Sequence, residues 1–204
     1  NSTDLNTNSD NISTEDITEY GLYLRIKKYG FNYKVIEDIY NNINCGVGKI
    51  YNSGLYELLI DRNTIIIQKK PAPFRRMKIP EQGTYVIDTS KDNEQRIIIS
   101  FSDITENFAI PKKNNEIALD ADKVKFPLIL RSAKDGDRFR PFGMKGTKLV
   151  SDFLTDRKYN LFRKHSQRIL EDNTNEIIWV VNERPSEFYR ITKESKRAII
   201  IEWK

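Results

Sequence analysis

The sequence predicts an α+β fold made of two small domains, each a mostly antiparallel sheet with flanking helices. Short apolar segments alternate with polar residues between turn residues, as in Tyr56, Leu58 and Ile60, which typifies antiparallel strands. Helical spacing appears in only a few places, among them residues 33–43. In the second half the predicted order is two strands, a loop, two helices and three strands, which favours a sheet layer with helices beside it.

In the first half, residues 1–18 are rich in Asn, Ser, Thr and Asp and predict a flexible tail. Residues 19–110 predict a middle domain of a helix and a β-meander. The helix has the apolar positions Val35, Ile36, Ile39 and Ile43, and Asn32 is placed to cap its N-terminus. Strands follow over residues 48–70, and a second hairpin is predicted over residues 84–104.

The second half begins after a polar, Pro- and Asn-rich stretch at residues 111–115, where a domain boundary is predicted. Residues 115–204 form the predicted C-terminal domain. Its strands are expected at residues 116–124, 126–133, 176–181, 187–191 and 197–203. Its helices are expected at residues 148–158 and 160–172.

Composition excludes several classes of protein. Hydrophobic residues make up 38% of the 204, enough for a sizeable core, and no apolar run approaches the length of a membrane span. The first residues lack the apolar centre of a signal peptide. The single cysteine, Cys45, excludes an internal disulfide framework and favours a reducing, cytoplasmic location.

Positive charge is concentrated in one stretch. Residues 131–168 hold 11 basic and four acidic side chains, whereas residues 1–105 are nearly balanced at 13 and 14. A local basic excess attracts polyanions, of which nucleic acid is the commonest, although a solvated basic face is the alternative.

The centre of the basic stretch is GDRFRPFGMKGTK, residues 136–148. Its glycines and Pro141 shape the backbone, Gly136, Gly143 and Gly146 by permitting turns closed to other residues. We expect Phe139 and Phe142 to anchor the loop, with base stacking as their alternative use. The cations Arg138, Arg140, Lys145 and Lys148 would then point outward to grip phosphates.

Catalytic and metal sites have weaker support. The chain has no Gly-Gly dipeptide and no G-x-x-x-x-G-K-[ST] loop, and His165 is its only histidine. A magnesium site is conceivable at Asp135, Asp137, Asp152 and Asp156. The interleaved cations instead favour ion pairs, so neither a catalytic residue nor a metal ligand is assigned.

Two segments carry a resemblance to a known family. RSAKDGDRFRPFGMKGTKLVSDFLTDRK and EIIWVVNERPSEFYRITKESKRAIII resemble the C-terminal domain of bacterial tRNA(Ile)-lysidine synthetase. The likeness spans residues 122–204, and a looser one covers residues 19–103. The sequence departs from the family pattern at Leu149, where a second lysine is usual, and at Asn182, where glycine is usual.

The resemblance implies a fold and a function. The C-terminal domain would be similar to an accessory domain of the phenylalanyl-tRNA synthetase β-subunit. The family's enzyme uses ATP and magnesium to join lysine to the wobble cytidine of an isoleucine tRNA, which changes its charging from methionine to isoleucine. In the family, the ATP site belongs to an N-terminal domain with the motif S-G-G-x-D-S, which this sequence does not contain. The resemblance therefore implies that the 204 residues bind the acceptor stem of the tRNA but have no ligase activity by themselves. The expected RNA-binding residues are Arg131, Arg138, Arg140, Lys145, Lys148, Lys158, Arg184 and Arg190.

Two other functions remain open at this point. The basic strip could be a solvated face of a protein-interaction or homodimerisation module. A metal-dependent hydrolase using Asp135 and Asp137 is the third possibility. RNA binding, sedimentation and magnesium titration distinguish the three.

Overall fold

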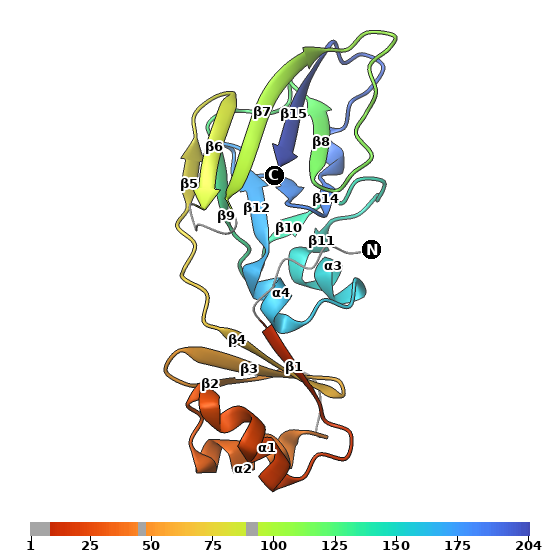
Figure 1. The fold of residues 1–204 in the computed structure, drawn as a ribbon. Coiled ribbons are helices and arrows are strands. Elements are labelled where there is room, and N and C mark those ends of the chain that lie inside the picture. The colour runs from red at the N-terminus through yellow and green to blue at the C-terminus, as the bar shows by residue number, and fades with distance from the viewer. Residues whose placement is uncertain (1–8, 45–47, 89–93) are drawn as a thin grey trace. The chain divides into compact units, whose positions relative to one another are not determined.

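The computed structural model describes residues 9–44, 48–88 and 94–204, and Cys45 lies outside them. The chain divides into two compact units, one formed by Asn1–Pro73 with Asn160–Phe162 and the other by Phe74–Tyr159 with Arg163–Lys204 (Figure 1). Both units consist mainly of antiparallel sheets with few helices, which confirms the predicted α+β class. Among the described residues, no helix is both long and apolar enough to cross a membrane.

The first unit is a four-stranded antiparallel sheet with two helices packed on it. Its sheet order is β1-β4-β3-β2. The elements are β1 (Ser9–Ser13), α1 (Glu19–Ile26), the 3-10 helix η1 (Lys27–Tyr29), α2 (Tyr33–Asn42), β2 (Lys49–Asn52), β3 (Tyr56–Asp61) and β4 (Thr64–Lys69). The Asn32 side chain accepts a hydrogen bond from the Val35 N–H at 3.0 Å, which confirms the predicted cap.

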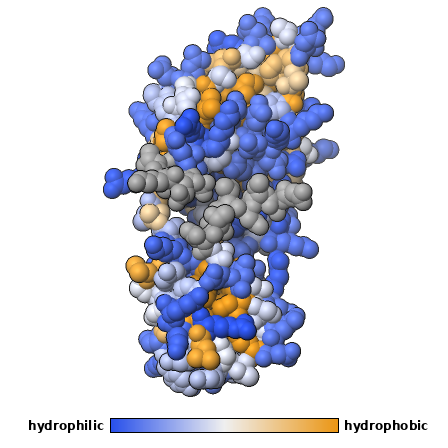
Figure 2. Space-filling model, in the orientation of Figure 1, coloured by the Kyte–Doolittle hydropathy of each residue, from blue (hydrophilic) through white to orange (hydrophobic). Residues whose placement is uncertain are grey.

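The core of this unit forms between the helices and one face of the sheet. Leu22 and Ile36 are fully buried from the two helices, and Leu58 and Ile65 from the sheet. Each such side chain stabilises the fold by about 1.5–3 kcal/mol relative to an exposed position. Figure 2 shows hydrophilic residues over most of the visible surface, with smaller hydrophobic patches among them.

The prediction of a tail through residue 18 is wrong for the described part of that segment. Residues Ser9–Ser13 form β1, which pairs antiparallel with β4. Ile12 is the buried residue of this strand, and Asp10, Asn11 and Ser13 are exposed. A mostly polar edge strand has no apolar alternation, so its composition resembles that of a tail.

The second unit contains two larger sheets and a small hairpin. A five-stranded sheet has the order β14-β13-β12-β9-β5, a four-stranded sheet has the order β6-β7-β15-β8, and β10 pairs with β11. The strands are β5 (Met77–Ile79), β6 (Gly83–Asp88), β7 (Gln95–Asp103), β8 (Glu116–Asp120), β9 (Leu128–Ser132), β10 (Arg138–Phe139), β11 (Lys148–Leu149), β12 (Arg168–Glu171), β13 (Ile177–Val180), β14 (Arg184–Pro185) and β15 (Arg197–Trp203). The helical elements of this part of the chain are α3 (Val150–Asp156), α4 (Leu161–Ser166) and the 3-10 helix η2 (Glu187–Tyr189).

The five-stranded sheet is buried on both faces. On one face, Leu130, Leu170 and Trp179 join the core that the four-stranded sheet shares. On the other face, Ile169 and Val180 pack with Phe153 of α3 in a second core. The β10–β11 hairpin contributes to this second core, so the basic loop is built on a fully packed layer.

The predicted domain boundary at residues 111–115 is wrong. The structure divides the chain after Pro73, and residues 111–115 connect β7 to β8 within the second unit. The last strand, β15, lies between those two strands and pairs with β7 over residues 97–103. The polar residues 111–115 are thus a connection inside one sheet and not a linker between domains. The sequence pattern could not show this, because the strand that joins β7 to β8 comes from the C-terminal end of the chain.

Two further elements differ from prediction. The helix expected over residues 160–172 ends at Ser166, and Arg168–Glu171 form β12, the middle strand of the five-stranded sheet. The strand expected over residues 187–191 is instead the turn of η2. Both segments are short and mix apolar with charged residues, so spacing alone does not separate helix from strand.

Candidate nucleic-acid interface

The basic loop is the tip of a short hairpin. Arg138 of β10 pairs with Leu149 of β11, and Phe139 pairs with Lys148. The Val150 N–H donates to the Asp137 carbonyl oxygen at 2.9 Å and continues this pairing to the start of α3. The loop therefore leaves and re-enters the unit at adjacent points.

One of the two predicted aromatic anchors is confirmed. Phe139 is 3% exposed and meets the Phe153 ring edge-on, with 5.2 Å between the ring centroids. Phe142 is 39% exposed, so the prediction that it anchors the loop is wrong. Its ring instead faces the Arg190 guanidinium, whose central carbon lies 5.8 Å from the ring centroid. The alternation of β10 buries Phe139, whereas Phe142 lies beyond the ladder.

The backbone of the loop is held by residues that the sequence singled out. Gly136 and Gly143 both have a φ of 85°, a conformation that other residues rarely adopt. Pro141 is buried and forms a β-bridge with Ser186. Gly146 has open space where a Cβ would stand, so neither crowding nor a left-handed φ requires glycine there.

The loop is docked along residues 184–187. The Phe142 N–H donates to the Pro185 carbonyl oxygen at 2.9 Å, and the Glu187 N–H donates to the Arg140 carbonyl oxygen at 2.7 Å. The Gly143 N–H donates to Glu187 Oε2 at 2.8 Å. That N–H, and then the Arg190 guanidinium 3.3 Å from Glu187 Oε1, hold the pKa of the Glu187 carboxyl below its usual range. The docking limits the conformational entropy that the loop can lose on binding.

Arg131 has a structural role at the base of the loop. Its guanidinium donates two 2.9 Å hydrogen bonds to the Asp137 carboxylate and one of 2.7 Å to Glu171 Oε2. Its side chain is only 14% exposed, and those of both carboxylates are 5% exposed. Burial alone would raise the pKa of Asp137, but hydrogen bonds from Arg131 and the Lys134 N–H hold it below its ordinary value.

The eight predicted RNA-binding residues differ in whether their side chains already have a partner within the protein. Arg131 is bound to buried carboxylates, Lys148 pairs with Asp156, and Arg190 pairs with Glu187. Arg184 donates to the Phe142 carbonyl oxygen at 3.5 Å, and Lys158 is exposed just after α3 with a φ of 59°.

The remaining predicted cations carry the accessible charge of the loop. Arg138, Arg140 and Lys145 are exposed. Within the described part of the chain none of the three forms an ion pair. They are therefore free to meet an external anion, whereas the paired cations must first exchange a partner.

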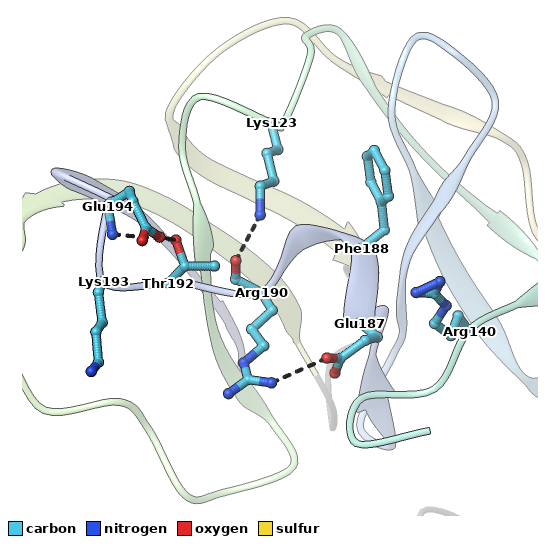
Figure 3. Close-up of a pocket in the computed structure, with 8 residues that line it drawn as sticks. All are labelled: Lys123, Arg140, Glu187, Phe188, Arg190, Thr192, Lys193 and Glu194. Atoms are coloured by element: carbon cyan, nitrogen blue, oxygen red, sulfur yellow. Dashed lines mark hydrogen bonds and ion pairs between the residues drawn. The ribbon is translucent and has the colours of Figure 1, made fainter. Parts of the chain in front are cut away.

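A hollow of about 460 Å³ opens beside the docked loop (Figure 3). It is lined by Lys123, Arg140, Glu187, Phe188, Arg190, Thr192, Lys193 and Glu194. Sequence reasoning missed Lys123 and Lys193. Lys193 directly follows the matched Thr192, which was a local signal. Lys123 donates to the Arg190 carbonyl oxygen at 2.9 Å across 67 residues of sequence, and only the fold brings it there.

Two of the four acids of the basic stretch form ion pairs. Asp137 is bound by Arg131, and Asp156 is bound by Lys148. Over residues 9–44, 48–88 and 94–204, no group of three His, Cys, Asp or Glu side chains is placed to hold a metal ion. His165 is exposed on α4, between Lys164 and Ser166.

The backbone conformation at Asn182 explains why asparagine can stand where the family pattern has glycine. It is the third residue of a turn in which the Glu183 N–H donates to the Val180 carbonyl oxygen at 2.9 Å, and its φ is 61°. Gly and Asn are the residues that such a position favours. Asn at this point therefore preserves the backbone that glycine would adopt.

Replacing Asn182 with glycine is expected to change the free energy of unfolding by less than about 1 kcal/mol, because both residues tolerate positive φ. Asn182→Val is expected to destabilise the chain by about 1–3 kcal/mol, since a β-branched residue is strained there. Urea unfolding followed by circular dichroism measures both. Equal stability of the two variants would show that this turn relaxes without cost.

Taken together, a docked loop that presents unpaired cations defines a candidate phosphate-binding surface of the kind found in nucleic-acid-binding proteins. The chain is also similar to known proteins. A family model described as "TilS substrate binding domain" matches residues 5–70, which lie in the first unit and do not include the loop. The chain is 37% identical over 183 residues to the tRNA(Ile)-lysidine synthase of Parabacteroides distasonis, an alignment that covers 88% of this chain and 40% of that protein.

The chain is therefore a homologue of the tRNA(Ile)-lysidine synthases, and the resemblance drawn from its sequence is confirmed. The chain matches these curated relatives over most of its own length, but it spans only about two fifths of theirs. Among solved structures, it is similar to a TilS C-terminal domain, with a TM-score of 0.47, 24% identity, and coverage of 66% of this chain and 92% of that one. It is also similar to an N-terminal fragment of the phenylalanyl-tRNA synthetase β-subunit from Pyrococcus horikoshii, with a TM-score of 0.43, 13% identity, and coverage of 96% of this chain and 67% of that one.

Proposed function

We propose that this chain is a tRNA-binding part of a tRNA(Ile)-lysidine synthase and that the docked loop of its second unit grips tRNA phosphates. The observation that carries the proposal is the placement of Arg138, Arg140 and Lys145, which are exposed on a hydrogen-bonded loop and form no ion pair within the described residues. The alignment with a full synthase over 88% of the chain supports it. The substrate-binding domain model matches residues 5–70 and supports substrate binding by the first unit, not by the loop.

The part of the tRNA proposed to meet the loop is the acceptor stem. A double-stranded RNA helix has a deep, narrow major groove, so proteins recognise it mainly through shape, 2′-hydroxyls and phosphates. Such recognition requires cations fixed at defined positions, and a hydrogen-bonded loop supplies them. This second unit would contribute affinity and orientation, while the identity of the modified base would be read elsewhere.

The reaction of the whole protein is part of the same proposal. A lysidine synthase would join lysine to the wobble cytidine of the isoleucine tRNA that reads AUA, with ATP and magnesium, in the cytoplasm. We assign that chemistry to the portion of such a protein that this chain does not match. The chain alone is expected to bind tRNA without ligating lysine, and no residue of it is assigned a catalytic role.

Binding to isoleucine tRNA is expected to weaken steeply as salt rises. Each phosphate contact contributes a slope of about −0.7 to −0.9 in a plot of log affinity against log salt, because bound counterions are released. Three loop cations therefore predict a slope of about −2 to −3 or steeper. Filter binding across a salt series measures the slope, and sedimentation of the free chain gives its oligomeric state.

Two results would contradict the proposal. The first is affinity that does not change with salt, which would exclude phosphate contacts as the main contribution. The second is the absence of RNA binding together with a stable dimer, which would favour the protein-interaction alternative. Ligation of lysine by the chain alone would contradict the proposed division of labour.

A further inference from the structure

The hollow beside the loop combines an exposed aromatic side chain with cations. Figure 3 shows Arg140 and Phe188 toward one end of it and Lys193 toward the other. Phe188 is 64% exposed, although it lies on the well-defined turn of η2. A single exposed apolar side chain is common on protein surfaces, but Phe188 differs from the others because it lines a hollow together with Arg140 and Lys193.

The buried side chain of Tyr189, the next residue, holds the turn that carries Phe188 in place. Tyr189 is 1% exposed, and its hydroxyl donates to Asp172 Oδ2 at 3.0 Å. Burial, and then the Asp172 carboxylate, raise the pKa of the Tyr189 hydroxyl, so it remains a hydrogen-bond donor at neutral pH. The Phe188 and Tyr189 rings meet edge-on with 5.2 Å between their centroids. Phe188 is therefore presented at a defined place and does not belong to a loose loop.

The acidic residues of the hollow are already occupied. Glu187 accepts from the Gly143 N–H and pairs with Arg190, and Glu194 accepts from the Thr192 hydroxyl at 2.6 Å. Arg140 and Lys193 form no ion pair within the described part of the chain, although the Arg140 charge contributes to lowering the pKa of Glu187. The lining thus offers two available positive charges and an aromatic face, with its carboxylates compensated.

We propose that this hollow binds unpaired nucleotides at the single-stranded end of an RNA whose duplex lies on the docked loop. A base would stack on Phe188, and successive phosphates would meet Arg140 and Lys193. Aromatic stacking and flanking cations are the usual means of holding single-stranded nucleic acid. The volume of about 460 Å³ is within the range of small-ligand sites. The inference rests on the proposed RNA-binding function and adds a second kind of RNA structure to it.

The test compares a short blunt RNA duplex with the same duplex carrying a single-stranded overhang of a few nucleotides at either end. Fluorescence anisotropy with the 204-residue chain gives both affinities. We expect one of the overhangs to strengthen binding about tenfold, the contribution of one stacked base. Phe188→Ala is expected to remove this gain while binding to the blunt duplex is unchanged.

Two control variants make the result specific. Phe188→Tyr keeps an aromatic face and is expected to keep the gain from the overhang. Tyr20→Ala removes an aromatic residue of α1 that is 70% exposed, and it is expected to change neither affinity. Circular dichroism spectra that match the unmodified chain show that each variant is folded.

The outcomes separate this inference from the proposed function. Salt-dependent binding of the blunt duplex without any gain from either overhang overturns the inference and leaves the function standing. Loss of both affinities in Phe188→Ala also overturns it, because the residue would then serve the duplex site. Absence of binding to every RNA overturns both. Competition by poly-glutamate that matches an oligonucleotide of equal charge would assign the hollow to acidic peptides and overturn the inference.

Discussion

Replacing Arg131 with methionine is expected to lower the free energy of unfolding by about 3–5 kcal/mol, the usual cost of removing one partner from a buried ion pair. The variant would leave the carboxylates of Asp137 and Glu171 buried without their shared guanidinium. Methionine fills a similar volume, so the loss would arise from charge and not from a cavity. Chemical denaturation at pH 7, followed by circular dichroism, measures it.

Two further variants test this explanation of the Arg131 effect. Lys134→Met removes a neighbouring exposed cation and is expected to change stability by less than about 0.5 kcal/mol. Adding Asp137→Asn and Glu171→Gln to Arg131→Met is expected to restore much of the loss, since no buried charge then remains unpaired. If the triple variant were as unstable as the single one, the network would act through packing and not through its charges.

The pH dependence follows from the depressed pKa of Asp137. A carboxylate with a lowered folded pKa contributes its full stability above its unfolded pKa, about 3.9, and loses it as the pH falls through the folded value. The unmodified chain is therefore expected to lose stability below about pH 4. In Arg131→Met the folded state takes up a proton at Asp137 more easily, so the difference between variant and unmodified chain should narrow in acid.

The local features of the fold could be predicted because their causes are local. The Asn32 cap, the β3–β4 hairpin and α3 each depend on residues close together in the sequence. The order of the strands depends on pairings that no local pattern records. Strand β15 pairs with β7 from about a hundred residues away. Because of this pairing, β7 belongs to the second unit, and the units divide after Pro73 and not at residues 111–115.

The candidate site shows the same division. Glycine and proline positions predicted a shaped loop, because φ preferences belong to single residues. Sequence alone could not distinguish Arg131 from Arg138, although both belong to the same basic stretch. Arg131 lies on β9 beside β12, which brings Glu171 against it, whereas Arg138 lies on an exposed position of β10. Partner choice among cations is a property of the tertiary structure.

Removing the accessible cations of the loop is the second large effect that we expect. The triple variant Arg138→Ala, Arg140→Ala, Lys145→Ala should weaken binding to isoleucine tRNA about a hundredfold at physiological salt, at roughly 1 kcal/mol per contact. The salt slope should fall by about 2–3, because three phosphate contacts no longer release counterions. Filter binding at several salt concentrations gives both quantities from one data set.

A charge-matched control separates these contacts from the general attraction of a basic protein. Lys112→Ala, Lys113→Ala, Lys196→Ala removes the same net charge from exposed positions of the second unit outside the loop. Long-range attraction depends on net charge and is screened within about a Debye length, so the control should weaken binding much less. Equal losses in both variants would mean that the loop provides only bulk charge. In that case its hydrogen-bonded docking along residues 184–187 would have no part in recognition, and the proposed role of the loop would be wrong.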